Sequence, residues 1–322
     1  MNKAKIWLLA CGLCLACLTA SAQTYPAKVV KMVVPNAPGG PSDVVGRLLA
    51  QKFTEAWGVP VIVDNKPGAG GNIGASTVAK STPDGYTLLV TNSAPISINK
   101  SLYTKMSFDP ETELAPISLV ASSPLLLLVP PNSRYRSVAD LVAAAKAEPG
   151  RLSYGSIGTG TAPHLAAEMF RSHAGVDLLH VPYSTVPQAL MAVMNGEVSM
   201  IFLTTDSSLA VATSGRAQAL AVTSRARSPV LPSVPTLVES GLRDYEVLGW
   251  YGIFAPAGTS QEILSRVNAE TRQALAQPDI KQKLNAIGFE IVGNAPADFT
   301  TFIATESDRW ARLLEAAKVR LD

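Results

Sequence analysis

The stretch VVPNAPGGPSD, residues 33–43, reads as the end of a strand, a glycine-rich turn and the start of a helix. Residues 28–34 are typical of a short strand, and the apolar residues of 44–53 recur at helical spacing. Pro41 suits the first helical position, because its missing N–H costs nothing there, and Asp43 suits the first turn. Such a turn leaves unpaired amides beside glycines that allow close approach, so it favours an anion.

A second stretch, LSYGSIGTGTAPH at residues 152–164, repeats the order of strand, small-residue turn and helix. Neither turn contains a lysine or an arginine. We therefore expect a carboxylate held by backbone N–H groups and by the hydroxyls of Ser42, Ser156, Thr159 and Thr161. Each charge-assisted hydrogen bond would contribute roughly 1.5 to 3 kcal/mol. The alternative is two ordinary tight turns before helices, which the pairing of the two stretches disfavours.

Residues 1–22 are typical of a secretory signal peptide. A start that carries lysines precedes an apolar run at 6–18, which is too short to span a bilayer, and small residues end the segment at Ala22. We expect cleavage after Ala22 and an exported protein. Lipid attachment at Cys17 is the alternative, although Cys14 stands where a lipid-attachment box has an aliphatic residue.

The composition changes when this segment is removed. The segment holds two lysines and no acidic residue, so the 27 basic residues fall to 25 and equal the 25 acidic ones. A neutral chain gives no reason to expect a nucleic acid or a membrane surface as partner. All three cysteines also lie in the segment, so we expect no disulfide in the exported chain, which is long enough for two cores. We expect a monomer without a cofactor.

The remaining pattern alternates short β runs with helical runs, as a mostly parallel sheet requires. It changes character near Pro124, in a run at 123–130 that reads as a buried strand, and a segment at 246–254 looks like a return crossing. Among the helices, we expect one after Ser137 and others at 261–276 and 297–317. We predict an α/β fold of two lobes, 23–122 plus 247–322 and 123–246, joined by a two-segment hinge. Lobes joined in this way can close over a ligand.

Catalytic patterns are weak. Residues 155–158 lack the first glycine of the G-x-S-x-G nucleophile turn, and no H-E-x-x-H pair occurs. With no cysteine after residue 22 and only three histidines in the sequence, no metal site is expected. Neither glycine turn has the spacing of a P-loop or of a dinucleotide fingerprint. His164 lies near a helix start and is expected to be neutral, while His180 is expected to be a packed strand residue. An exported serine hydrolase that uses Ser156 and His164, within about 3 Å of each other, is the enzymatic alternative.

Two further residues follow predicted strands and should face the same rim. Asp206 could accept a hydrogen bond from an amino, amide or hydroxyl group of a ligand, or it could cap the helix that follows. Tyr183 is placed by Pro182 at a strand end, where an aromatic wall with a hydroxyl is useful.

These segments resemble the Bug family, the TctC-like substrate-binding proteins of tripartite tricarboxylate transporters. The resemblance covers essentially all of the chain after residue 22, and it is carried by Tyr25-Pro26, 38–40 with Asp43, NKPGAGGNIG at 65–74, PDGYTL at 83–88, HVPY at 180–183, LPSVPT at 231–236 and APAGT at 255–259. It implies a type II periplasmic binding protein that captures a small carboxylate without chemistry and delivers it to the membrane subunits of a transporter. A partner role for a membrane sensor kinase is the alternative within the same scaffold.

The resemblance also implies the site residues. The carboxylate would be held by two turns, partly through ordered water, and the far end of the ligand would be read by more variable positions. The turn residues are Ala37, Gly39, Gly40, Ser42 and Asp43 in the first lobe and Ser156, Gly158, Thr159, Thr161 and His164 in the second. The variable positions are Asn92, Ser93, Tyr183, Thr205 and Asp206. Where family members often have a lysine-glycine pair after Pro-Tyr, this chain has Ser184 and Thr185. Without that cationic contact, the resemblance does not single out a dicarboxylate or a tricarboxylate such as citrate, and the ligand stays open among organic acids, amino acids and aromatic carboxylates.

Overall fold

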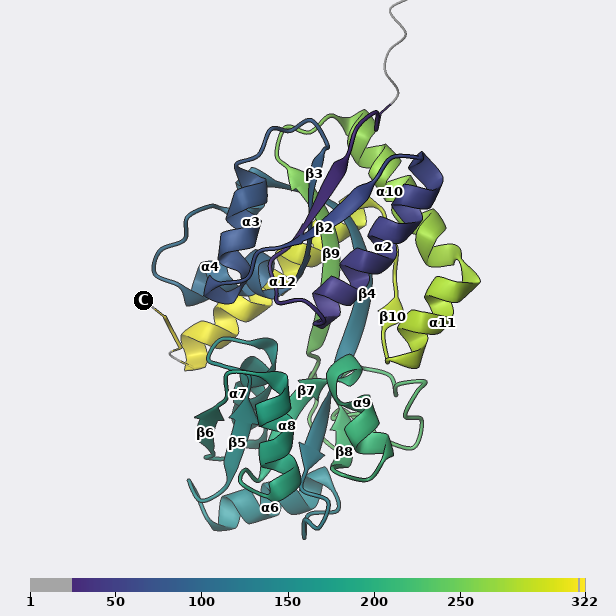
Figure 1. Cartoon of the computed structure of the whole chain (residues 1–322). Coiled ribbons are helices and arrows are strands. Elements are labelled where there is room, and N and C mark those ends of the chain that lie inside the picture. Colours follow the sequence, from purple (N-terminus) through teal and green to yellow (C-terminus); the bar gives the residue numbers. More distant parts are fainter. Residues whose placement is uncertain (1–24, 318, 322) are drawn as a thin grey trace, which may run out of the picture.

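The computed structural model describes residues 25–317 and 319–321. The predicted signal peptide, its cleavage after Ala22 and the alternative lipid site at Cys17 lie outside these residues. The described chain forms one ten-stranded sheet with the order β2-β1-β3-β9-β4-β7-β5-β6, with β8 and β10 also paired to β4. Helices cover the sheet in two bodies, one above the other, which we call lobe 1 and lobe 2 (Figure 1).

Lobe 1 is built on β1, β2 and β3, with β9 and the first part of β4 beside them. Its elements are β1 (Val30–Val34), α2 (Pro41–Trp57), β2 (Val61–Asn65), the 3₁₀ turn η1 (Ala69–Gly71), α3 (Asn72–Ala79), β3 (Thr87–Asn92), the π turn η2 (Ala94–Ile98), α4 (Asn99–Leu102), α5 (Pro110–Glu113), β9 (Leu248–Pro256), α10 (Gln261–Ala276), α11 (Pro278–Ala286), β10 (Glu290–Ile291) and α12 (Pro296–Ala317).

Lobe 2 is built on β5, β6 and β7, with the second part of β4 and β8 beside them. Its elements are α6 (Val138–Ala147), β5 (Ser153–Ser156), α7 (Ala162–Ala174), β6 (Leu179–Pro182), α8 (Val186–Asn195), β7 (Met200–Thr204), α9 (Thr205–Thr213) and β8 (Gln218–Val222).

The two lobes repeat one strand order. Lobe 1 reads β2-β1-β3-β9-β4 and lobe 2 reads β6-β5-β7-β4-β8, so the β1–α2 turn and the β5–α7 turn occupy equivalent places. In each lobe the first three strands are parallel, and the next strand is antiparallel to them. The repeated strand-turn-helix unit in the sequence is therefore a repeated unit of the fold.

The strand directions bring two edges of the sheet together. β4 (Leu114–Val129) runs from lobe 1 into lobe 2. β3 pairs antiparallel with β9, and β9 pairs antiparallel with β4, so β3 runs in the same direction as β4. β7 pairs antiparallel with β4 and therefore runs in the opposite direction. The parallel strands of lobe 1 therefore end toward lobe 2, and those of lobe 2 end toward lobe 1. Ligands bind outside the carboxyl ends of parallel strands, so the boundary between the lobes is the candidate region.

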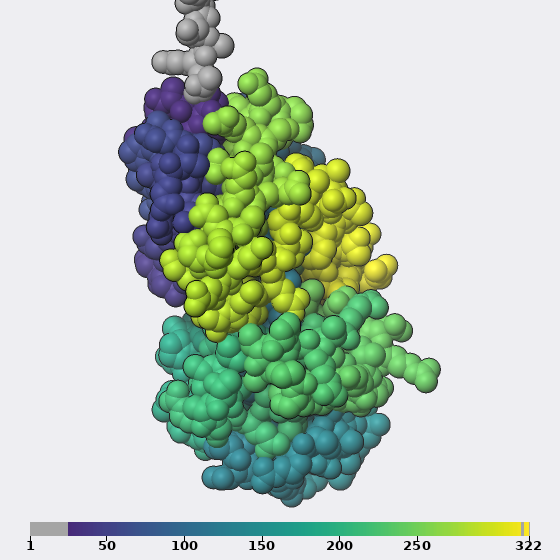
Figure 2. Space-filling view, turned by 90° about the vertical axis from the view of Figure 1, so that its right-hand side faces the viewer, coloured from purple at the N-terminus to yellow at the C-terminus, as the bar shows by residue number. Residues whose placement is uncertain are grey.

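Apolar clusters lie on both faces of the sheet in each lobe. In lobe 1, α2, α10 and α11 cover one face, while α3, η2 and α12 cover the other. In lobe 2, α8 and α9 cover one face, and α6 and α7 cover the other. Figure 2 shows the two bodies in contact, with purple, lime and yellow segments above teal and green ones. Within residues 25–317, no helix combines the length and apolar character needed to cross a membrane.

Candidate functional site

The predicted site residues follow the ends of parallel strands. Ala37, Gly39, Gly40, Ser42 and Asp43 lie between β1 and the first turn of α2, and Ser156, Gly158, Thr159, Thr161 and His164 lie between the end of β5 and the first turn of α7. Asn92 ends β3 and Ser93 follows it, Tyr183 follows β6, and Thr205 and Asp206 begin α9 after β7. Strand direction therefore places all of them at the edges that face the lobe boundary.

Asp43 organises the turn of lobe 1. Its Oδ2 accepts hydrogen bonds from Gly39 N–H at 2.9 Å and from Arg47 Nε at 2.8 Å, and its Oδ1 accepts one from Asn65 Nδ2 at 2.9 Å. The residue is 2% exposed. Burial alone would raise the pKa of Asp43, but the bonds from Arg47, Gly39 and Asn65 outweigh it and hold the pKa below its ordinary value. The contacts give Asp43 the role of positioning the turn, and direct contact with a ligand stays a prediction.

His164 takes the equivalent place in lobe 2. It is the third residue of α7, as Asp43 is the third residue of α2, and its Nδ1 accepts a hydrogen bond from Gly160 N–H at 3.0 Å. Both donors are glycines four residues earlier with positive φ, +81° at Gly39 and +78° at Gly160. One arrangement is thus built twice, with a carboxylate in lobe 1 and an imidazole in lobe 2.

The environment of His164 fixes its chemical form. Burial, with repulsion from His180, lowers the pKa of His164 to about 4. Because Nδ1 accepts from a backbone N–H, the remaining proton of the neutral ring is on Nε2. His164 is therefore an uncharged N–H donor at neutral pH.

The two helix starts are open. Among the described residues, no side chain caps the N-terminus of α2 or of α7, where the N-cap residues are Gly40 and Thr161. The Thr161 hydroxyl instead donates to Gly158 O at 2.7 Å. By contrast, the lobe 2 helix α6 has a complete capping box between Ser137 and Asp140. The amides at the starts of α2 and α7 are available to an anion.

Ser156 belongs to the turn rather than to a catalytic pair with His164. Its side chain is fully buried, and its Oγ accepts from Gly158 N–H at 3.2 Å. The Oγ also lies 2.7 Å from Nε2 of His180, not of His164. A nucleophile without solvent access that bonds to its own turn does not fit hydrolysis.

His180 lies on β6 and packs against its neighbours, as predicted, and it also contacts Ser156 of the second turn, which was not predicted. The ring stacks on Tyr154 at 4.8 Å and on His164 at 4.2 Å between centroids, so it forms one side of the second turn. Burial lowers the pKa of His180. The parallel pairing of β5 with β6, which sets Tyr154 beside His180, is the signal that could have identified the contact.

The residues predicted to contact the far end of a ligand lie at the ends of three different strands, β3, β6 and β7. Asn92 Oδ1 accepts from Ala94 N–H at 3.1 Å, and the Thr205 hydroxyl donates to Pro124 O on β4 at 2.8 Å. Asp206 accepts from the Ser207 hydroxyl at 3.1 Å, but its Oδ1 is shielded and has no hydrogen-bond partner among the described residues. Burial raises the pKa of Asp206. Ser93 is buried, and Tyr183 is half-buried.

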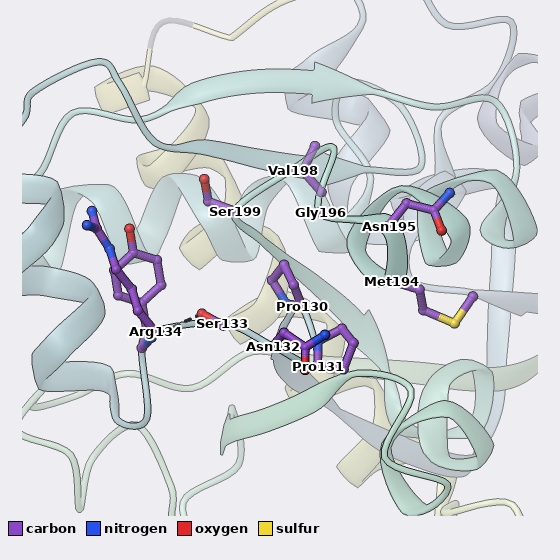
Figure 3. A pocket seen from close by; sticks show the side chains of 11 residues that line it. Pro130, Pro131, Asn132, Ser133, Arg134, Met194, Asn195, Gly196, Val198 and Ser199 are labelled. Carbon is purple, nitrogen blue, oxygen red and sulfur yellow. Dashed lines mark hydrogen bonds between the residues drawn. The ribbon is translucent and has the colours of Figure 1, made fainter.

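Two surface hollows lie elsewhere. One of about 360 Å³ is at the far end of lobe 2, between the residues after β4 and those before β7 (Figure 3). The other, of about 600 Å³, is at the far end of lobe 1, around the starts of β1 and β3. In the described part of the chain, neither is lined by a predicted site residue, and no group of three or more His, Cys, Asp or Glu side chains could hold a metal ion.

Comparison with known proteins gives a consistent result. Residues 45–319 match the family described as tripartite tricarboxylate transporter family receptor. A UPF0065 protein encoded in the tcbD-tcbE intergenic region of Pseudomonas sp. (strain P51) is 38% identical, over 94% of this chain and 92% of the relative. The periplasmic binding protein BugD is 34% identical, with a TM-score of 0.81, over 92% of this chain and 99% of BugD. An R. palustris protein solved with adipate is 33% identical, with a TM-score of 0.84, over 92% of this chain and 99% of that protein.

Proposed function

The chain belongs to the tripartite tricarboxylate transporter receptor family, and we propose that it captures a small organic carboxylate in the periplasm for a transporter of that type. The family consists of periplasmic substrate-binding proteins rather than enzymes, and the resemblance of the motifs to Bug proteins is confirmed. The α/β fold with two lobes joined by two crossing strands is likewise the type II binding-protein fold. We place the lobe boundaries at 122/123 and 246/247, and we propose export with cleavage after Ala22.

One observation carries the proposal: two equivalent helix starts, both without a side-chain cap, follow strands that end toward the lobe boundary. Backbone N–H groups at a helix start hold an anion through hydrogen bonds and the helix dipole. Such neutral donors suit a carboxylate better than a phosphate, which brings more charge.

The ligand would bridge the two turns. We propose that its carboxylate accepts from amides of the two helix starts and from the hydroxyls beside them, with His164 Nε2–H as a further donor. Asn92, Tyr183 and Asp206 would contact the other end. The similar R. palustris protein was solved with adipate, an aliphatic dicarboxylate, and this supports an organic acid of comparable size.

Isothermal titration of the protein, purified without refolding, with a library of mono-, di- and amino carboxylates tests the proposal. We expect adipate or another short carboxylate to bind, and its uncharged diamide to bind at least about 100-fold more weakly, because the charge-assisted bonds are lost. Equal binding of acid and amide, or no binding across the library, would contradict carboxylate capture.

A further inference from the structure

The short helix α4 belongs to lobe 1 but packs into lobe 2. Leu102, its last residue, is 2% exposed and lies in an apolar cluster with Leu165 and Phe170 of α7. Its backbone is fixed from the other side, because Leu102 O accepts from Leu321 N–H at 2.7 Å. A lobe 1 side chain is thus held against the helix that begins at the second turn.

The contact reaches the turn itself at Gly160. A Cβ built on Gly160 would lie 2.0 Å from Leu102 Cδ2 and 3.0 Å from Leu102 Cγ. The Cδ2 distance is too short for a real methyl contact. The Cγ distance is tighter than most real contacts, so Leu102 or the turn would have to shift in addition to any rotation of the leucine end. Gly160 is also the residue whose N–H bonds to His164. Leu102 therefore occupies the space that any side chain at Gly160 would need.

The same helix is tied to the rim of lobe 1. Asn99, one turn before Leu102, donates through Nδ2 to Gly70 O at 3.1 Å and to Asn72 Oδ1 at 2.7 Å. Gly70 lies in η1 and Asn72 begins α3, and the neighbouring Gly71 and Gly74 lie against Pro35 at the start of the first turn. One short helix therefore contacts the edge of lobe 1 through Asn99 and the second turn, in lobe 2, through Leu102.

We infer that Leu102 is a positioning residue for the carboxylate site: by packing on Gly160 it sets the distance at which the two turns face each other. The effect on carboxylate binding rests on the proposed function, whereas the contact between Leu102 and Gly160 does not depend on it. Gly160 has no Cβ, so Leu102 can pack directly against its backbone. An added methyl group would have to move the turn, and His164 with it, away from lobe 1, so this contact sets the distance between the two turns.

The test is a double-mutant cycle read by adipate titration. Gly160→Ala should weaken adipate binding by about tenfold or more, because the added methyl group overpacks against Leu102. Gly175→Ala is the matched control for strain, because Gly175 ends α7 at φ +60° and its Cβ would meet no described atom within 4 Å; it should leave affinity unchanged. Gly160→Ala combined with Leu102→Ala should bind within about threefold of Leu102→Ala alone, because the clash is gone.

Small-angle X-ray scattering without ligand provides a second readout. Gly160→Ala should enlarge the radius of gyration relative to Gly175→Ala, and adding Leu102→Ala should reverse the change. If wild type binds no carboxylate but the scattering differences appear, the proposed function fails and the positioning contact stands. If wild type binds adipate while Gly160→Ala matches Gly175→Ala in affinity and in radius, or the cycle is additive, the inference is wrong.

Discussion

Asp43 and His164 each take the third position of a helix and accept a hydrogen bond from the N–H of a glycine four residues earlier. This bond occupies the glycine N–H, while the amides at the helix start have no side-chain cap and are available to a ligand. The two residues differ in charge, so their contributions to stability respond to pH in different ways.

Replacing Asp43 by asparagine should destabilise the protein by about 1 to 3 kcal/mol, since three charge-assisted bonds are weakened in a buried turn. The pKa of Asp43 is depressed in the folded state, so its contribution is present above the unfolded pKa and is lost as pH falls through the folded pKa. Urea denaturation at neutral pH and in mild acid measures both effects. Asp298→Asn, at an exposed first-turn aspartate of α12, should change stability by less than about 0.5 kcal/mol. A similar loss in both variants would contradict the special role of Asp43.

His164 should also make the protein less stable as pH falls, but for a different reason: a buried neutral ring must take up a proton, whereas Asp43 loses its charge. Its pKa is about 4 in the folded protein against an ordinary 6.5, so the unfolded state binds more protons between these values and stability falls as pH falls through this window. The loss should approach about 3 kcal/mol. His164→Asn keeps an acceptor near Nδ1 and cannot take up the proton, so it should remove most of this loss. Unfolding curves at pH 7 and pH 4 test the prediction, with the exposed His173→Asn as a control that should behave like wild type; an unchanged pH response in His164→Asn would contradict it.

At the scale of elements, the uncapped starts of α2 and α7 mark a conflict between helix stability and binding. Gly40→Asp places a carboxylate at the N-cap of α2, where φ is −78° and a side chain is allowed. We expect it to raise stability by up to about 1 kcal/mol and to weaken carboxylate binding by about 100-fold, because the new side chain takes the ligand's place on the amides. Thermal unfolding and adipate titration measure the two changes.

Ser137→Ala is the matched comparison, because it removes a cap from a helix outside the site. It should lower stability by about 1 kcal/mol and leave adipate affinity unchanged. Unaltered ligand affinity in Gly40→Asp would show that the start of α2 is not the anion site.

The sequence predicted these elements well where local signals were strong. The helix after Ser137, the helices at 261–276 and 297–317 and the crossing near 247 all lie within two residues of the observed elements. The strand expected at 123–130 is instead the end of β4, which begins at Leu114. Residues 114–122 contain Pro116 and serines, a weak local strand signal, and they are extended because β9 pairs with them along their length. A local sequence pattern does not reveal pairing between strands that are far apart in the chain.

The functional site was likewise predicted only where its signal lies within one stretch of sequence. Glycines, hydroxyls and a proline at a helix start can be recognised in one stretch of chain, so both turns were predicted. The partners of those turns could not be, because Asn65, His180 and Leu102 reach them from other segments. The Ser156–His180 contact and the packing of Leu102 on Gly160 are products of strand pairing and lobe contact.

At the scale of the whole molecule, the balance of charge predicts how binding responds to salt. Residues 23–322 are formally neutral, and neither turn carries a basic side chain. The affinity for adipate should therefore change by less than about threefold between about 0.05 and 0.5 M sodium chloride, because fixed dipoles at contact distance are little screened. Titration with adipate across that range of salt concentration measures this change in affinity.

Ser184→Lys supplies the matched variant, since it adds a cation two residues after β6, at the edge that faces the lobe boundary. Its adipate affinity should rise at low salt and fall back as salt increases. A steep salt dependence in wild type would mean that a cationic side chain outside the turns holds the ligand.

The sixteen-residue strand β4 pairs with β9 through its first half and with β7 and β8 through its second. Neither lobe can therefore be cut out as a complete sheet, since removing one strips the other of an interior strand. Genetic exchange of a single lobe between relatives would have to preserve both the register and the length of this strand. New ligand preferences in such a scaffold are thus expected to arise by changes in the rim loops and not by shuffling of halves.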